Sequence, residues 1–169
     1  MIDRFDPKRQ QWHVNFDHEK LDVYRAELEF ISWATDLLTE IGELKGRRIG
    51  EVCDQLERAS LSALLNTAEG NGKRQRPTRA KFFDDARGSA TECAACLDAL
   101  VAKRLSNGNR IQAGKDILVR IVSMLSKLVT KFEGTAEGGM MFRDDESDYR
   151  IERDHKNIED EDENEGRGR

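Results

Sequence analysis

The residues with the clearest chemical potential form a short basic segment in the middle of the chain. Residues 68 to 82 read AEGNGKRQRPTRAKF and carry two glycines, one proline and five cations. In a P-loop, backbone N–H groups cradle phosphates, and a lysine followed by Ser or Thr serves phosphate and metal. This segment departs from that pattern, because Thr67 stands where the first glycine belongs, Arg74 follows Lys73, and a helical pattern precedes it. Nucleotide hydrolysis is therefore not predicted here.

The cations of this segment are a candidate surface for nucleic acid or another anion. They are Lys73, Arg74, Arg76, Arg79 and Lys81. The last two are predicted in the first turn of a helix, where a cation costs about 0.3–1 kcal/mol at low salt. A bound phosphate would relieve this cost, because it pairs with free N–H groups and with guanidinium groups. The alternative is a solvated hinge in which Lys81 pairs with Asp84 or Asp85, one turn further on.

A second basic group lies in the predicted connection GELKGRRIGE, residues 42 to 51, and consists of Lys45, Arg47 and Arg48. An antiparallel helix hairpin would place this group either at the same end of the molecule as the first group or at the opposite end. We include these three residues in the candidate anion surface.

The remaining reactive residue types do not form a catalytic or metal-binding pattern. Cys93 and Cys96 have a spacing that suits zinc or redox chemistry, but zinc needs two more ligands and only Cys53 remains. A redox pair would need a thioredoxin-like strand. We interpret these cysteines as small apolar side chains in helices. All three histidines lie outside the predicted bundle, so no base stands beside a nucleophile. The sequence predicts no catalytic residue, no metal, no cofactor and no enzymatic activity.

Four helical segments are predicted to position these residues, because apolar side chains recur at intervals of three and four. They span about residues 19–41, 49–69, 78–105 and 109–132. Thr78 is the expected cap of the third segment, and SNGN at 106–109 is a strong turn signal. Four amphipathic helices with short connections predict an all-α, antiparallel up-and-down four-helix bundle.

Several details of these helices are also predicted. Asp17 is taken as the cap of the first helix, Gly70 and Gly72 as the residues that release the second, and Gly88 as an interruption of the third. The expected inner face of the first helix consists of Leu21, Tyr24, Leu28, Ile31, Thr35 and Leu38.

Composition favours one helical domain with tails, because 36% of residues are charged, 37% are hydrophobic and only two are proline. We divide the chain into an N-terminal arm at 1–18, whose aromatic residues are expected to dock on the body, a bundle at 19–133, and a tail at 134–169. Residues 143–169 contain 12 acidic and 6 basic side chains, so the net charge of −5 leaves about −5 + 6 = +1 for the rest. The polar, acidic tail is expected to be disordered.

No run of about 18 apolar residues and no secretory signal is present, so we expect a cytoplasmic protein that does not insert into membranes. A net negative charge also argues against a general nucleic-acid binder.

The run from 55 to 100 resembles a bacterial four-helix bundle family first known from proteins encoded in intervening sequences of the 23S ribosomal RNA gene. The matching features are NTAEG at 66–70, the basic segment, the Thr78 cap, Phe82 and Phe83, and ARGSATE at 86–92. Residues 19–33 resemble the opening helix of the family. The family pattern has Glu three residues after the cap, completing a capping box, and here Lys81 stands in that position.

The resemblance implies a non-enzymatic bundle that assembles as a homopentamer and binds nucleic acid or protein. The accessory variability determinant of diversity-generating retroelements belongs to the same group and binds a reverse transcriptase and RNA. That representative is markedly basic, unlike this chain. We expect an oligomeric binding or scaffold protein that contacts RNA or DNA through the basic segment. The alternatives are a retroelement accessory protein, or a purely structural homo-oligomer whose acidic tail keeps it soluble or competes for the basic patch.

Overall fold

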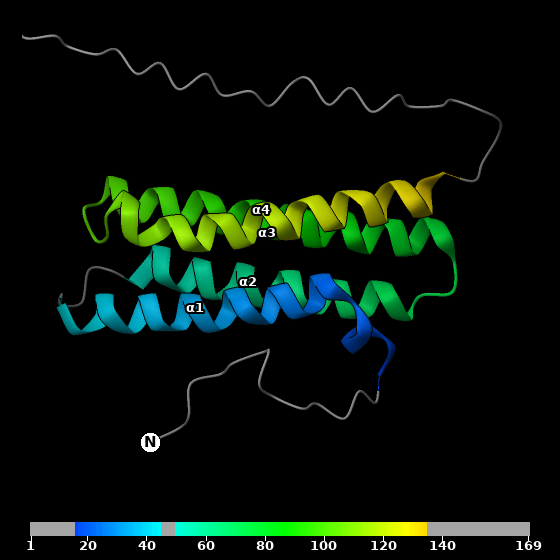
Figure 1. Ribbon diagram of the computed structural model, residues 1–169, viewed down its shortest axis with the longest axis horizontal. Helices are drawn as coiled ribbons and strands as arrows, with labels where there is room; N and C mark the ends of the chain where they lie inside the picture. The colour runs from blue at the N-terminus through cyan, green and yellow to red at the C-terminus, as the bar shows by residue number, and fades with distance from the viewer. Residues whose placement is uncertain (1–15, 45–49, 135–169) are drawn as a thin grey trace, which may run out of the picture. The chain divides into compact units, whose positions relative to one another are not determined.

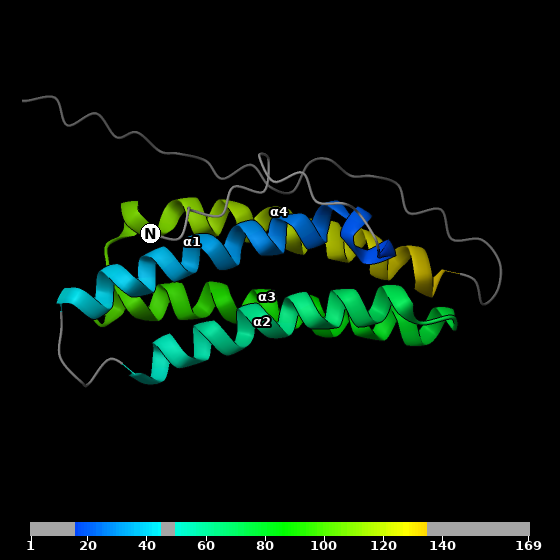
Figure 2. The ribbon, with the colours of Figure 1, turned by 90° about the horizontal axis from the view of Figure 1, so that it is seen from below.

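The chain forms a four-helix bundle in a computed structural model that describes residues 16–44 and 50–134, except the side chains of 43 and 44. A short 3-10 helix, η1 (Asp17–Lys20), precedes α1 (Asp22–Leu44), α2 (Gly50–Gly72), α3 (Arg76–Ala102) and α4 (Gly108–Glu133). Successive helices run in opposite directions, with α1 and α2 in one layer and α3 and α4 in the other (Figure 1). Each helix packs against two neighbours, and Figure 2 shows α4 beside α1 and α3 beside α2. Within the described residues, no Cα atoms of diagonally placed helices lie within 8 Å of each other. The predicted all-α antiparallel bundle is confirmed.

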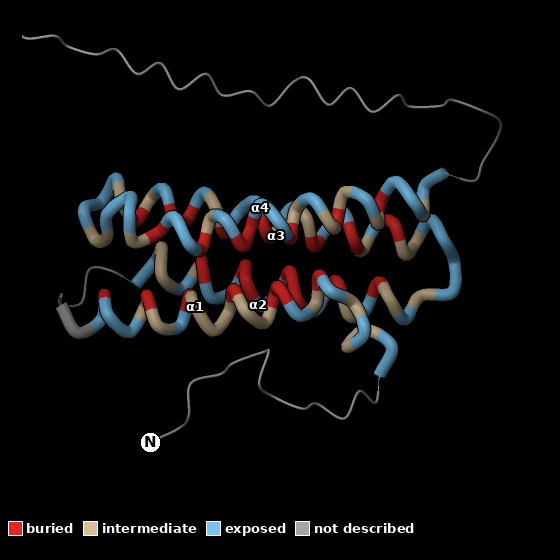
Figure 3. The backbone as a smooth tube through the Cα atoms, in the orientation of Figure 1, coloured by how far each residue is buried: buried red, intermediate tan, exposed pale blue. Residues whose placement is uncertain are grey.

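The core lies between the two layers, where the inner side of every helix is buried (Figure 3). The largest completely buried apolar side chains include Phe30, Leu37, Leu56, Phe83, Leu97, Leu100, Ile121 and Leu125. Burying one such side chain contributes about 1.5–3 kcal/mol relative to leaving it exposed. On α2, the buried side includes Leu56, Ala59, Ala63, Leu64 and Thr67.

The predicted inner face of α1 is wrong. The residues that α1 buries are Val23, Ala26, Glu27, Phe30, Ala34, Leu37 and Ile41. The predicted set is rotated from this stripe by roughly 100°, the angle between consecutive residues of a helix. Because α1 carries two parallel apolar stripes, periodicity alone did not separate them, and the buried stripe contains small alanines and a carboxylate. Among the predicted residues, Leu28 and Ile31 are only half-buried and Thr35 is exposed.

The connection between α2 and α3 is shorter than predicted. Gly70 and Gly72 belong to α2 instead of releasing it, so only the three residues 73–75 separate the two helices. The cap of α3 is Gln75 and not Thr78, and Pro77 lies in the first turn, where its missing N–H costs nothing. Lys81 therefore does not occupy the capping-box position.

Three other boundaries differ from the prediction. Asp17 lies within η1, whose cap is Phe16, so it does not cap α1. Gly88 does not interrupt α3, which runs unbroken to Ala102. The break between α3 and α4 lies at 103–107 and not at the predicted 106–109. Asn107 caps α4 by accepting a hydrogen bond from the N–H of Arg110 at 3.0 Å, so Gly108 and Asn109 already belong to the helix.

Two glycines allow helices to approach closely. A Cβ on Gly70 would lie 2.9 Å from the Cβ of Phe82, and a Cβ on Gly114 would lie 2.2 Å from the Trp33 ring. Real Cβ contacts do not occur at such distances. Glycine at position 70 therefore allows α3 to pack closely on α2, and glycine at position 114 allows the Trp33 ring of α1 to pack on α4.

Some predictions concern residues beyond the described ranges. These are the arm as far as residue 15, the tail from residue 135, and the basic group Lys45, Arg47 and Arg48. Within the described ranges, every helix is either too short or too polar to cross a membrane.

Candidate anion-binding end of the bundle

The five cations of the predicted 73–81 group gather at one end of the bundle. Because the helices alternate in direction, the end of α2, the start of α3 and the end of α4 lie at this same end (Figure 1). The last turn of α4 adds Lys131 to the group. We call this region the basic end and define it by Lys73, Arg74, Arg76, Arg79, Lys81 and Lys131.

Both lysines of the 73–81 group are paired with carboxylates. Lys73 Nζ lies 2.7 Å from Glu69 Oε1 and 4.7 Å from the centre of the Phe82 ring. Lys81 Nζ lies 2.7 Å from Asp85 Oδ2, and this hydrogen bond raises the pKa of Lys81. The predicted pairing of Lys81 one turn along the helix is confirmed. Such exposed pairs contribute only about 0.3–0.5 kcal/mol each, so an anion could compete for either lysine.

Two arginines instead join helix ends. Arg79 Nη2 donates to the carbonyl of Asn71 in α2 at 2.7 Å, and Arg76 Nη2 donates to the carbonyl of Lys131 in α4. Their guanidinium carbons lie 4.8 Å and 5.3 Å from the centre of the Phe132 ring. Arg79 Nε is buried and has no hydrogen-bond partner among the described groups.

These contacts explain why cations are tolerated at the start of α3. An isolated helix N-terminus repels them, but here the C-terminal ends of α2 and α4 lie beside it, and helix C-termini attract cations. The last carbonyls of a helix also lack partners within the helix, and the arginines supply donors. An external anion is therefore not needed to stabilise Arg76 and Arg79.

Arg74 is the exception. Its side chain is exposed, and it forms no ion pair or hydrogen bond with the described part of the chain. Three other cations of the basic end have hydrogen-bond or aromatic partners but no carboxylate partner in the described part of the chain: Arg76, Arg79 and Lys131. The basic end therefore keeps an excess of positive charge. A phosphate could meet Arg74 without breaking an internal contact.

The second predicted basic group, Lys45, Arg47 and Arg48, lies outside the described residues. Residues 45–49 themselves are not described, but the helix ends on either side of them, Leu44 and Gly50, lie at the opposite end of the bundle (Figure 1). The structure thus brings together the 73–81 group and leaves the flanks of the other group far from it.

Sequence reasoning missed Lys131 and Phe132 as members of the basic end. The hydrogen bond from Arg76 to Lys131 joins positions 55 residues apart, so no local pattern reveals it. A usable signal was the predicted topology itself, since an up-and-down bundle places the end of the fourth helix beside the second connection.

A buried carboxylate lies between α1 and α2. Glu27 is 2% exposed; its Oε1 accepts a hydrogen bond from Thr67 Oγ1 at 2.7 Å, and its Oε2 has no partner among the described groups. Burial raises the pKa of Glu27 to about 8, and the Thr67 hydrogen bond opposes this shift. Within the part of the chain that the structure describes, Glu27 has one hydrogen bond and no ion pair, so we assign the pair to the core.

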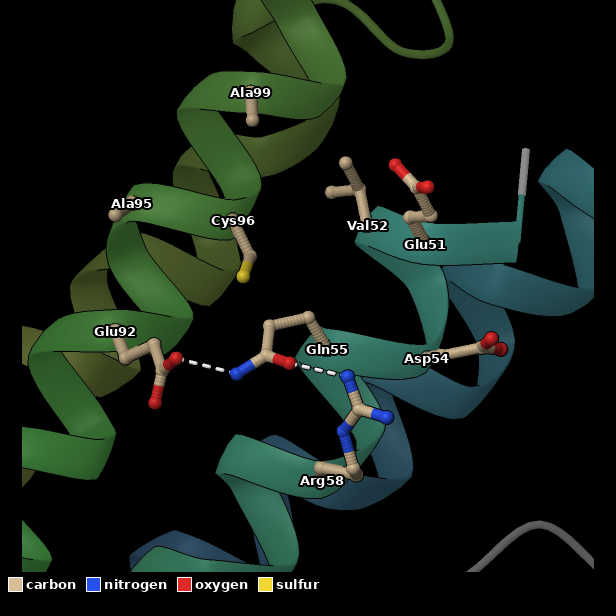
Figure 4. A pocket seen from close by; sticks show the side chains of 9 residues that line it. All are labelled: Glu51, Val52, Asp54, Gln55, Arg58, Glu92, Ala95, Cys96 and Ala99. Atoms are coloured by element: carbon tan, nitrogen blue, oxygen red, sulfur yellow. Dashed lines mark hydrogen bonds between the residues drawn. The ribbon is translucent and has the colours of Figure 1, made fainter. Parts of the chain in front are cut away.

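A groove of about 570 Å³ lies between the first half of α2 and the second half of α3 (Figure 4). A chain of hydrogen bonds crosses it, since Arg58 donates to Gln55 and Gln55 donates to Glu92. Cys96 lines the same groove, and burial raises the pKa of its thiol. A thiol with a raised pKa is a poor nucleophile, so the groove does not have the chemistry of a cysteine enzyme.

The other cysteines behave as predicted. Cys93 is completely buried in α3, and burial raises the pKa of its thiol to about 12. Cys53 is half-buried, and burial together with Asp54 and Glu57 raises its pKa as well. The interpretation of Cys93 and Cys96 as buried helix residues is confirmed.

Comparison with known families agrees with this architecture. A family model described as 23S rRNA-intervening sequence protein matches residues 19–127, which is more than half of the chain. The match covers the whole of α1, α2 and α3, the three-residue basic connection, and most of α4. A search of curated proteins finds no match.

Proposed function

The chain belongs to the 23S rRNA-intervening sequence protein family, and on this premise we propose a non-enzymatic, homo-oligomeric protein that binds RNA or DNA phosphates through its basic end. The observation that carries the proposal is Arg74, which is exposed within a group of cations and has no partner in the described chain. The resemblance described above implies five copies, and a reverse transcriptase as a further partner stays a prediction.

Oligomerisation would convert a modest surface into an effective one. One unpaired arginine and its neighbours make few phosphate contacts, and each contact is weak at physiological salt. When several copies present the same end, the second and later contacts become intramolecular and the apparent affinity rises without new chemistry. Binding should therefore be steeply salt-dependent.

A purely structural homo-oligomer is the second candidate, and a specific observation favours it. Four of the five predicted cations already have internal partners, namely Lys73, Arg76, Arg79 and Lys81. These contacts stabilise the bundle end without any ligand, so most of the basic composition has a sufficient structural cause.

Binding of fluorescent RNA and DNA to the full chain across a salt series separates the two candidates. If nucleic acid binds, Arg74→Gln should weaken binding and reduce the salt slope by about one for each copy in contact. Lys103→Gln is the matched control, because Lys103 is an exposed cation just after α3, at the opposite end of the bundle. If neither the full chain nor a chain ending at Gly139 binds at low salt, the nucleic-acid role is eliminated. Equal losses in both variants would eliminate the basic end as the binding site.

Two further measurements test the remaining parts. Light scattering at micromolar concentration measures the oligomeric state, and a monomer would remove the multivalent argument. A chain ending at Gly139 lacks the 12 carboxylates of residues 143–169. If only this shorter chain binds nucleic acid, the acidic tail suppresses binding in the full protein.

A further inference from the structure

The α1–α2 layer carries an apolar stripe on its outer side. We define it by Tyr24, Leu28 and Ile31 of α1, which are half-buried, and by Leu61 and Leu65 of α2, which are 51% and 56% exposed. These two leucines are among the most exposed large apolar side chains of the described chain. A contiguous apolar surface of this kind usually has a partner.

The two halves of the stripe lie at the same level along the bundle, as the register of the two helices shows. The bond from Thr67 to Glu27 shows that Glu27 points toward α2. Tyr24 and Ile31, three residues before and four after Glu27, lie on the same side of α1. Since the helices run in opposite directions, the turn of α1 that follows Glu27 lies beside the turns of α2 that precede Thr67, which carry Leu61 and Leu65.

The chain itself enters at the beginning of this stripe. The helix η1 packs against both α1 and α2. Phe16, 63% exposed at its start, stacks on His18 with ring centres 5.7 Å apart, and His18 meets the edge of Tyr24 at 4.8 Å. A row of aromatic rings thus leads from the first described residue to the first residue of the stripe.

The sequence before Phe16 has the pattern of a segment with one apolar side. Trp12, Val14 and Phe16 alternate with His13 and Asn15. In an extended chain, alternate side chains point to the same side. Two cations, at positions 8 and 9, precede this alternation.

We propose that residues 8–16 lie in extended conformation along the α1–α2 apolar stripe, with Val14 over Leu65 and Trp12 over Leu61. An extended chain rises about 3.3 Å per residue, so Trp12 lies about 13 Å from Phe16. A helix rises about 1.5 Å per residue, so about 13 Å corresponds to about nine residues of α2. Leu61 lies about nine residues before the last turn of α2, so the distance from Phe16 to Trp12 matches this separation.

The same spacing brings opposite charges together. Lys8 and Arg9 lie about 23–26 Å from Phe16 in an extended chain, which reaches the first turns of α2. That part of α2 carries Glu51, Asp54 and Glu57, and no ion pair joins these three to a cation of the described chain. The arm therefore matches the stripe in both apolar and charged positions.

Fluorine NMR of the full chain labelled with 5-fluorotryptophan tests the proposal. The chain has two tryptophans, and Trp12→Phe assigns their signals. We expect a soluble gadolinium chelate to relax the Trp12 signal as weakly as that of the half-buried Trp33. In a Leu61→Asp, Leu65→Asp variant, relaxation of Trp12 should rise to the level of the urea-unfolded chain. Val119→Asp is the matched control, because Val119 is 65% exposed and lies on α4, the helix diagonal to α2. This substitution should leave the relaxation of the Trp12 signal unchanged.

Three results would overturn the proposal. The first is strong relaxation of Trp12 in the unmodified chain, and the second is protection that survives the double variant. The third is loss of Trp12 protection on dilution at the same concentration at which light scattering shows an oligomer dissociating. A second copy, and not the arm, would then cover the stripe. If the double variant fails to fold, Trp12→Ser provides the reverse test: the methyl signals of Leu61 and Leu65 should gain relaxation, and unchanged methyl signals would refute the contact.

Discussion

Replacing Glu27 by Gln should stabilise the bundle, and the gain should grow as the pH rises from 5 to 8. Glu27 lies in the α1–α2 interface at 2% exposure and has one hydrogen bond, from Thr67. An ionised carboxylate there loses the hydration that it has in the unfolded chain. Gln keeps a carbonyl oxygen that can accept the Thr67 hydrogen bond, and it never ionises.

The size and sign of the effect follow from the pKa. Burial raises the pKa of Glu27 from 4.5 to about 8, so the folded chain binds this proton more tightly than the unfolded chain. The free energy of unfolding therefore falls as the pH rises through this interval and is constant above it. At about 1.4 kcal/mol per pKa unit, the full cost is at most about 5 kcal/mol and is about 3 kcal/mol at pH 7. A typical domain has only about 5–15 kcal/mol of stability in total.

Urea unfolding followed by circular dichroism at pH 5 and pH 8 measures this cost. Glu27→Gln should be close to the unmodified chain at pH 5 and clearly more stable at pH 8. Glu29→Gln is the control on the same helix; it removes a partly exposed ion pair with Arg120 at 3.4 Å, so it should change stability by less than about 1 kcal/mol at either pH. Equal stability of the unmodified chain and Glu27→Gln at pH 8 would refute the reasoning.

Two further predictions concern close helix contacts. Gly70→Ala should destabilise the bundle by about 1–3 kcal/mol in urea unfolding, because the new Cβ would meet Phe82 at 2.9 Å. Gly88→Ala, with nothing within 4 Å of its new Cβ, should instead stabilise α3 by about 0.5–1 kcal/mol, and a loss there would contradict this. Gly114→Ala should also destabilise, since its Cβ would lie 2.2 Å from the Trp33 ring. Adding Trp33→Leu should recover part of that loss, and additive losses in a double-mutant cycle would show that the ring is not the obstacle.

Sequence periodicity predicted the four helices, and the short connections between them predicted their alternating directions. It failed for the inner face of α1, where Leu28 and Ile31 form a second apolar stripe beside the buried one. Local capping rules also placed the start of α3 at Thr78, although Pro77 already fits the first turn. Propensity did not reveal that Gly70 stays helical, because the reason is the approach of Phe82 from α3.

The basic end was predicted in part. The five cations of α3 and of the connection that precedes it were evident as a cluster in the sequence, and the pairing of Lys81 followed from helical spacing. The bonds of Arg76 and Arg79 to the carbonyls of Lys131 and Asn71 were not predictable, because they depend on which helix ends become neighbours. Glu27 likewise reads as a surface residue until the rotation of α1 is known.

The arginines that hold the ends of α2 and α4 also connect ligand binding to fraying of those ends. An anion that captured Arg76 or Arg79 would leave the carbonyl of Lys131 or Asn71 without its donor, and the last turn of α4 or α2 would open more often. By linkage, anion binding raises the equilibrium constant for opening of the helix end by a certain factor. The open helix end then binds the anion more tightly than the closed end by the same factor. Faster amide exchange in the last turns of α2 and α4 would then report a ligand that has captured Arg76 or Arg79.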